Sequence, residues 1–233
     1  MTKIKNRFDV LLWDVDGTLL DFIAAEKAAI KSLFIEFGLG ECSDNMVADY
    51  SEINKAYWER LERGEMSKPE ILVRRFEDFF ASAGLDASAA PAFNEAYQVR
   101  LGDTVVFCDD SYSLVSSLRG KVRQYAVSNG TIVAQTRKLE RSGFDGLLDG
   151  VFLSEKLGYE KPAAEFFDRV FEAIGEVERG RVLIIGDSLT SDITGGNRAG
   201  IRTCWYNPGG LENKTAAHVD YEIRDLNEIT AII

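Results

Sequence analysis

A short apolar segment, residues 8–13, ends in two aspartates one residue apart, Asp14 and Asp16, and Gly17 and Thr18 follow them. An apolar run of this length that stops at turn-forming residues is typical of a buried strand in a parallel sheet. Ligands of such sheets bind just beyond the carboxyl ends of the strands. Two neighbouring carboxylates repel each other, so we expect a compensating charge, and a divalent cation is the simplest candidate. The alternative is an ordinary strand end with aspartates in a turn.

The composition is that of a globular protein whose partners are small molecules. The chain has 233 residues, of which 45% are hydrophobic and 28% charged, and its formal net charge is −11. An acidic protein repels nucleic-acid phosphates, so no nucleic-acid polymer is expected as a partner. No window approaches the roughly 18 apolar residues of a membrane span, and no membrane partner is expected. Three scattered cysteines without a C-x-x-C pair suit a reducing compartment, which predicts a cytoplasmic protein.

The order of helical and strand patterns predicts an α/β core interrupted by a helical insert. Helical periodicity dominates from Asp21 to about Leu101, and strand patterns alternate with helices from about Val105 onward. Such alternation is typical of a parallel sheet covered on both faces. We therefore predict an α/β core from residues 1–19 and 105–233 and an all-helical domain from residues 20–104. The expected strands after the first are 124–127, 150–153, 181–185, 202–206 and 220–223, and the expected helices of the core are 110–118, 131–142, 163–174 (opened by Pro162), 191–199 and 225–233.

Polar side chains follow several of these strands at the point where each strand ends. In a parallel sheet the carboxyl ends of the strands share one edge, so these side chains should meet there. The residues concerned are Asp14 and Asp16, Ser128 and Asn129, Lys161, and Asp187 and Asp192.

Taken in this order, these residues resemble the four motifs of the haloacid dehalogenase (HAD) superfamily. They are D-x-D-G-T at 14–18, Ser128 after a strand, Lys161 followed by proline, and the Gly-Asp-Ser of 186–188 with Asp192. The helical insert after the first motif is similar to the cap of subfamily I, and the resemblance implies a Rossmann-like core. Residues 195–201 and 203–207 look like the pyrimidine 5′-nucleotidase branch. One departure is Ala163-Ala164 after Pro162, where the family often has a second proline, and this should alter helix entry rather than chemistry.

The resemblance implies a role for each motif residue. Asp14 is expected to attack phosphorus as a carboxylate nucleophile. Mg²⁺ is the implied cofactor, held by the Asp14 side chain, the Asp16 backbone carbonyl and Asp187. Asp16 would protonate the leaving alcohol and then take a proton from the attacking water. Lys161 would supply positive charge to the phosphoryl oxygens.

The remaining site residues are expected to bind phosphate or to support the groups that do. Ser128 and the backbone N–H groups of Val15, Asp16 and Asn129 would hydrogen-bond the phosphoryl oxygens. Asp192 is expected either to join the metal site or to hold Lys161, and the sequence leaves both open. Residues outside the motifs are interpreted as structural: the insert aromatics Tyr57, Trp58, Phe76, Phe79 and Phe80 as core, Arg74 and Arg75 as solvated helix charges, and His218 as a surface residue.

Four functions fit these motifs to different degrees. The first is a Mg²⁺-dependent phosphomonoesterase for a small phosphorylated metabolite, foremost a pyrimidine 5′-nucleotidase and otherwise a broad-specificity sugar or phosphoglycolate-type phosphatase. A 2-haloacid dehalogenase is disfavoured because it gains nothing from the second acid, Asp16, and the family's dehalogenases lack it. A sugar phosphomutase would share all four motifs. A silent binding protein would normally have lost one of Asp14, Asp16, Lys161 or Asp187. A monomer or a homodimer is expected.

Overall fold

A six-stranded parallel sheet forms the centre of the protein in the computed structural model, which describes residues 7–233. The strand order is β3-β2-β1-β4-β5-β6, so the first apolar segment, β1 (Val10–Trp13), lies inside the sheet between β2 (Arg123–Ser128) and β4 (Val182–Gly186). All four residues of β1 are buried, as a strand covered on both faces requires. The other strands are β3 (Gly150–Leu153), β5 (Arg202–Tyr206) and β6 (Tyr221–Ile223).

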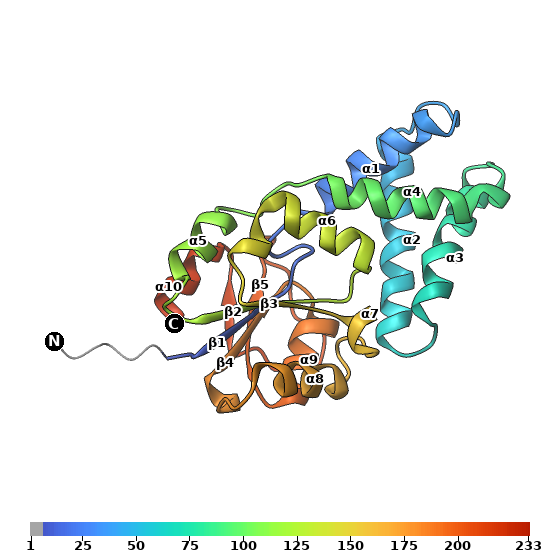
Figure 1. Ribbon diagram of the computed structural model, residues 1–233. Helices are drawn as coiled ribbons and strands as arrows, with labels where there is room; N and C mark the ends of the chain where they lie inside the picture. Colours follow the sequence, from blue (N-terminus) through green and yellow to red (C-terminus); the bar gives the residue numbers. More distant parts are fainter. Residues whose placement is uncertain (1–6) are drawn as a thin grey trace.

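Helices cover both faces of the sheet, and alternate residues of β1 pack on opposite faces. Leu11 and Trp13 belong to a core shared with α5 (Ser111–Leu118) and α6 (Ile132–Ser142). Val10 and Leu12 belong to a second core with α8 (Ala164–Ile174) and α9 (Thr194–Ala199). Figure 1 shows these two helical layers on either side of the strands. The predicted Rossmann-like α/β core is confirmed. The remaining helices of the core are α7 (Ser154–Leu157), α10 (Ile229–Ile232) and the short 3₁₀ segments Phe144–Gly146, Arg179–Arg181 and Leu226–Glu228.

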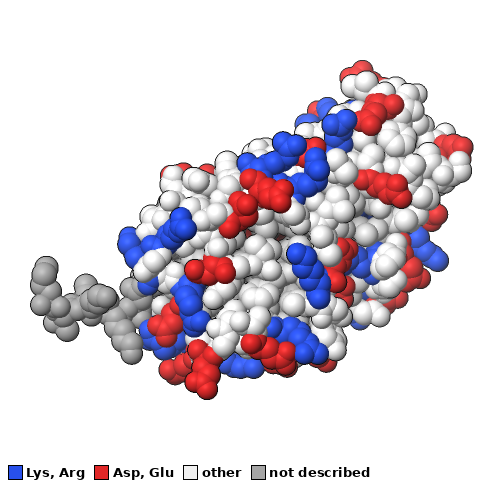
Figure 2. Space-filling model, in the orientation of Figure 1, with Lys and Arg blue, Asp and Glu red and all other residues white. Residues whose placement is uncertain are grey.

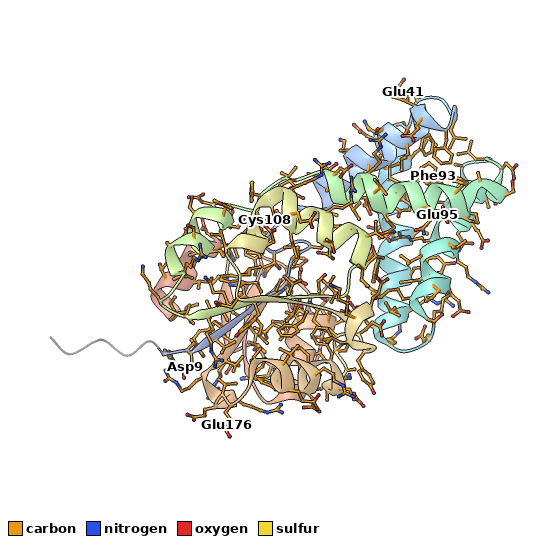
Figure 3. All side chains as sticks on the ribbon, viewed as in Figure 1. Asp9, Glu41, Phe93, Glu95, Cys108 and Glu176 are labelled. Carbon is orange, nitrogen blue, oxygen red and sulfur yellow. The ribbon has the colours of Figure 1, made fainter. Side chains whose placement is uncertain are left out.

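The predicted helical insert is confirmed between β1 and β2. It contains α1 (Phe22–Glu36), α2 (Asp44–Glu62), α3 (Lys68–Ser82), a 3₁₀ turn (Ala87–Ala89) and α4 (Ala90–Asp103). These helices, called the cap below, have a core of their own. Its buried Phe93, labelled in Figure 3, contacts the rings of Phe34, Phe37, Phe76 and Phe80. Ala134 of α6 joins this core, and α4 runs alongside α6 (Figure 1). The domain boundaries at 19/20 and 104/105 stay a prediction.

A buried polar network inside the cap corrects one interpretation of the sequence. Arg75 is only 2% exposed, so it is not a solvated helix charge. Its guanidinium donates to Asn54 Oδ1 at 2.7 Å and to Asn94 Oδ1 at 3.1 Å. Asn54 in turn donates to the buried carboxylate of Glu26 at 2.8 Å. These partners come from α1, α2 and α4, so the network links the cap helices around the buried guanidinium of Arg75. The helical pattern around residue 75 does not indicate this burial.

Three local features differ from the expected elements. The short helix α7 follows β3 directly and was not predicted. The predicted helix 191–199 begins earlier, as a π-helical segment (Leu189–Ile193) that continues into α9. Pro162 does not open α8, because that helix starts at Ala164 and Pro162 lies in the preceding turn, after a cis peptide bond.

The surface carries both signs of charge. On the face drawn in Figure 2, acidic and basic side chains are interspersed. No helix of residues 7–233 has the length and apolar character needed to cross a membrane.

Candidate active site

The motif residues meet in one pocket between the carboxyl edge of the sheet and the cap. Each comes from a different segment: Asp14 directly follows β1, Ser128 is the last residue of β2, Asp187 directly follows β4, and Lys161 lies in the loop after α7. The pocket has a volume of about 190 Å³. Its lining residues are Asp14, Asp16, Phe22, Trp58, Glu62, Ser128, Asn129, Gly130, Lys161, Asp187, Ser188, Ser191 and Asp192. Of the sequence-predicted site residues, Val15 alone is missing from the lining, because its side chain is fully buried in the core, and its expected contribution is a backbone N–H group.

Lys161 is the cation at the centre of this pocket. Its side chain is 1% exposed, and its ammonium group donates to Asp14 Oδ1 at 2.7 Å, to Asp192 Oδ1 at 2.7 Å and to the Val127 carbonyl at 2.8 Å. Burial opposes a charge on this amine, but the two carboxylates outweigh it and raise the pKa of Lys161. Asn129 fixes the lysine backbone, since its side-chain amide donates to the Lys161 carbonyl and accepts from the Lys161 N–H, both at 2.8 Å.

Three carboxylates share the pocket with Lys161. Asp14, Asp187 and Asp192 each offer an oxygen within 4.8 Å of the others. Burial, with Asp192 and Asp187 nearby, raises the pKa of Asp14 well above its usual range, although Lys161 opposes the shift. The Asp187 side chain is exposed at the mouth of the pocket. Its carboxylate is nevertheless desolvated by nearby protein atoms, and this desolvation, together with the negative charge of Asp192, raises the pKa of Asp187 to about 7. One ammonium group does not neutralise three carboxylates, and hard oxygen donors of this kind suit Mg²⁺.

Gly17 makes this close approach of the acids possible. Its φ of +86° lies in the left-handed region, and a β-carbon there would lie 2.6 Å from Asp187 Oδ2. A side chain at position 17 would therefore displace the carboxylate. The glycine of the D-x-D-G-T motif gives space to a metal-ligand candidate as well as turning the chain.

Asp192 has contacts that fit both of its expected roles. One of its oxygens accepts from Lys161, and the other accepts from the Ser188 N–H at 3.2 Å. It therefore holds the lysine while remaining part of the acid cluster. Ser128 is also held, with its hydroxyl accepting from the Gly130 N–H at 3.0 Å.

Two side chains of the cap helix α2, the aromatic Trp58 and the acidic Glu62, line the pocket one helical turn apart. Trp58 packs, partly buried, against the cluster of Tyr57, Leu61 and Ile71 and also lines the pocket, so a core role describes only part of it, whereas Tyr57, Phe76, Phe79 and Phe80 are buried as predicted. Glu62 accepts a hydrogen bond of 2.6 Å from Thr190 of the core. Burial, with Asp192 nearby, raises the pKa of Glu62 to about 7, although Thr190 opposes the shift.

Two residues of the site were missed from the sequence. Gln135 Nε2 donates to Asp16 Oδ2 at 2.5 Å, and the Lys138 ammonium group pairs with Asp16 Oδ1. Both are buried on the inner face of α6. The available signal was that these polar residues interrupt the apolar side of an amphipathic helix. His218 is exposed and lies outside the pocket lining.

Comparisons with known proteins agree with this geometry. The sequence profile of the haloacid dehalogenase-like hydrolases matches residues 8–200. YfnB of Bacillus subtilis (strain 168), described as a HAD-hydrolase, is 37% identical over 228 residues, which are 98% of this chain and 96% of YfnB. The crystal structure of magnesium-bound YfnB superimposes with a TM-score of 0.90 at 36% identity, covering 97% of this chain and 99% of that one.

Two similar proteins carry a more specific name. Pyrimidine 5′-nucleotidase PynA of Streptococcus pneumoniae (strain ATCC BAA-255 / R6) is 37% identical and covers 95% of this chain and 93% of its own. Pyrimidine 5′-nucleotidase YjjG of Escherichia coli (strain K12) is 26% identical and covers 97% of this chain and 98% of its own.

Proposed function

This chain belongs to the haloacid dehalogenase-like hydrolases, and we propose that within this family it is a Mg²⁺-dependent phosphomonoesterase that acts on pyrimidine nucleoside monophosphates. The observation that carries the phosphatase chemistry is the placement of Asp14 and Asp16 in one pocket with Lys161. Asp14 Oδ1 lies 2.7 Å from Lys161 Nζ, inside a cluster of further acids.

Asp14 is the nucleophile of the proposed reaction. Its carboxylate forms a bond to phosphorus while the bond from phosphorus to the leaving oxygen breaks. Lys161 faces the same space and offsets negative charge on the phosphoryl oxygens, and Ser128 and Asn129 line the pocket beside it. Asp14, Asp187, the Asp16 carbonyl and Asp192 are the groups that would hold Mg²⁺, which supplies the remaining positive charge when bound.

Asp16 separates this reaction from dehalogenation. It gives a proton to the leaving alcohol and then removes one from the water that hydrolyses the aspartyl phosphate. A halide leaves without a proton, so a dehalogenase has no use for a second acid here. A phosphomutase needs the same acid. The cap residues, which select the molecule that enters the pocket, therefore decide between a mutase and a phosphatase.

Cap residues support a nucleoside as the leaving group. Trp58 offers an aromatic face on which a base can stack, and Glu62, one turn further along α2, offers a carboxyl group to sugar hydroxyls. The similarity to PynA and YjjG along nearly the whole chain points to the same class.

A phosphate-release screen tests the proposal. With Mg²⁺ present, we expect pyrimidine monophosphates to be hydrolysed with higher kcat/KM than sugar phosphates, phosphoglycolate or pyridoxal phosphate. If sugar phosphates rank as high, the nucleotidase assignment is wrong and a general phosphatase remains. If no phosphomonoester is hydrolysed, the phosphatase assignment is wrong as well.

A further inference from the structure

We propose that Gln135 and Lys138 of α6 are positioning residues that orient the Asp16 carboxylate for proton transfer, an inference that rests on the proposed phosphatase function. These two side chains contact neither Asp14 nor the predicted phosphate-binding groups through any hydrogen bond among the described residues. Their shared partner is the residue that handles the proton.

Each carboxylate oxygen of Asp16 accepts a hydrogen bond from one of the two side chains. Gln135 Nε2 donates to Oδ2 at 2.5 Å, and Lys138 Nζ pairs with Oδ1. Asp16 itself is partly open to the pocket, with its side chain 23% exposed. The two donors, three residues apart on one helix, fix the plane of the carboxylate, because a group held at both oxygens cannot turn about its own axis.

Both donors are buried, although glutamine and lysine are among the residues that resist burial most. Gln135 is 0% and Lys138 1% exposed, and the Lys138 ammonium lies 5.3 Å from the centre of the Phe22 ring. Gln135 Oε1 is buried without a hydrogen-bond partner among the described residues. A buried polar atom without a partner lowers stability, so a purely structural explanation accounts poorly for this glutamine. Donation to Asp16 is the interaction that it does make.

The loop that contains Gly130 leaves space for the Gln135 side chain. A β-carbon at Gly130 would lie 2.2 Å from Gln135 Nε2, so this glutamine fits only because residue 130 has no side chain. Gly130 also donates to the Ser128 hydroxyl in the loop predicted to bind phosphate. Asp16, Gln135 and that loop therefore form one packed unit.

The helix that carries the two donors is also fixed to the cap. The Thr131 hydroxyl caps the start of α6 and donates to Gln98 Oε1 of α4 at 2.7 Å. Six residues further along, Arg137 pairs with Asp103 at the end of α4 at 2.6 Å. A rigid helix anchored at these points is a suitable support for a group whose direction matters to chemistry.

The two proton transfers explain why direction matters. In the first step the Asp14–phosphorus bond forms, the bond from phosphorus to the leaving oxygen breaks, and that oxygen receives the proton of Asp16. In the second step water attacks phosphorus, the Asp14–phosphorus bond breaks, and Asp16 recovers a proton from the water. Both transfers need the carboxyl oxygen within hydrogen-bond reach and correctly aimed, so a freely turning Asp16 would slow them without weakening substrate binding.

The test compares substrates whose leaving groups differ in their need for a proton. The probes are cytidine 5′-monophosphate, whose alkoxide needs one, and p-nitrophenyl phosphate, whose phenolate leaves without one. With Lys138→Met and saturating Mg²⁺, we expect kcat/KM for the nucleotide to fall about 10- to 100-fold, and that for p-nitrophenyl phosphate to change by less than about threefold. KM for the nucleotide should change little. Release of p-nitrophenolate should show a burst, because hydrolysis of the aspartyl phosphate still depends on Asp16.

Three further variants make the result specific to the contact. Gln135→Met leaves the buried Lys138–Asp16 pair in place and should show the same substrate selectivity to a smaller degree. Lys138→Arg keeps a cation beside Asp16 and should recover part of the nucleotide activity. Lys156→Met removes an exposed lysine of the core and should leave both activities unchanged. Thermal unfolding of each variant shows whether it is folded.

Two outcomes overturn the inference. Folded Lys138→Met and Gln135→Met proteins that retain wild-type kcat/KM for the nucleotide would show that the contacts do not serve the reaction. Equal losses with both substrates would show a structural role. Failure of the proposed function is distinguishable, because the wild type and Lys156→Met would then hydrolyse neither phosphomonoester.

Discussion

Replacing Glu62 with glutamine should remove a pH dependence of stability that arises from the position of this residue between the cap and the core. The pKa of Glu62 is raised from 4.5 to about 7 by burial and by Asp192. The folded protein therefore holds this proton more tightly than the unfolded chain does. The resulting stabilisation is fully present below the unfolded pKa, falls as the pH rises through about 7, and is absent above it.

The size of the effect follows from the shift. One pKa unit corresponds to about 1.4 kcal/mol, so the rise in the Glu62 pKa from 4.5 to about 7 changes the free energy of unfolding by at most about 3.5 kcal/mol across this range. Solvent reaches part of the side chain, which reduces that value. Glutamine keeps the size and can accept the Thr190 hydrogen bond, but it has no proton to lose.

Urea unfolding of the metal-free protein at several pH values between 5 and 8 measures the effect. We expect the free energy of unfolding of the wild type, relative to Glu62→Gln, to fall as the pH rises. Glu52→Gln, an exposed position on the same helix, is the matched control and should show no such trend. A difference between wild type and Glu62→Gln that stays constant or grows with pH would refute the reasoning.

Three other substitutions test separate parts of the account. Trp58→Ala should lower kcat/KM for pyrimidine monophosphates by about tenfold or more, since stacking of a base on an aromatic ring is worth about 1–3 kcal/mol, and should leave phosphoglycolate hydrolysis nearly unchanged. Equal losses on both substrates would contradict a base-stacking role. Arg75→Met should lower the free energy of unfolding in urea by about 3 kcal/mol, because Asn54 and Asn94 lose a buried donor. A cost below about 1 kcal/mol would mean that the cap network adds little. Lys161→Met should reduce kcat by about 100-fold or more at saturating Mg²⁺, and wild-type turnover would remove this lysine from the proposed chemistry.

The sequence was sufficient for the fold because its signals are local. The apolar run of β1, the helical periodicity of the insert and the alternation after residue 105 can each be recognised from periodicity alone. The grouping of Asp14, Ser128, Lys161 and Asp187 could also be predicted, since every strand of a parallel sheet ends at the same edge.

The missed features depend on contacts between distant segments. Arg74 and Arg75 are adjacent in a helical pattern, and the burial of Arg75 is decided by partners on other helices. Trp58 belongs to the same run of cap aromatics as Tyr57, but it also lines the pocket, which is completed by residues of the core. Gln135 and Lys138 have no motif, and their contact with Asp16 joins residues more than a hundred positions apart.

The proposed chemistry depends on Asp14 acting as a nucleophile on phosphorus. Its most direct measurement is Mg²⁺-dependent phosphate release from cytidine 5′-monophosphate by the wild type and by Asp14→Asn, with urea unfolding to show that both are folded. The asparagine is nearly isosteric but lacks the nucleophilic carboxylate, so we expect a loss of at least about a thousandfold, and chelation of Mg²⁺ should abolish wild-type turnover as well. Undiminished phosphate release by a folded Asp14→Asn protein would contradict the account.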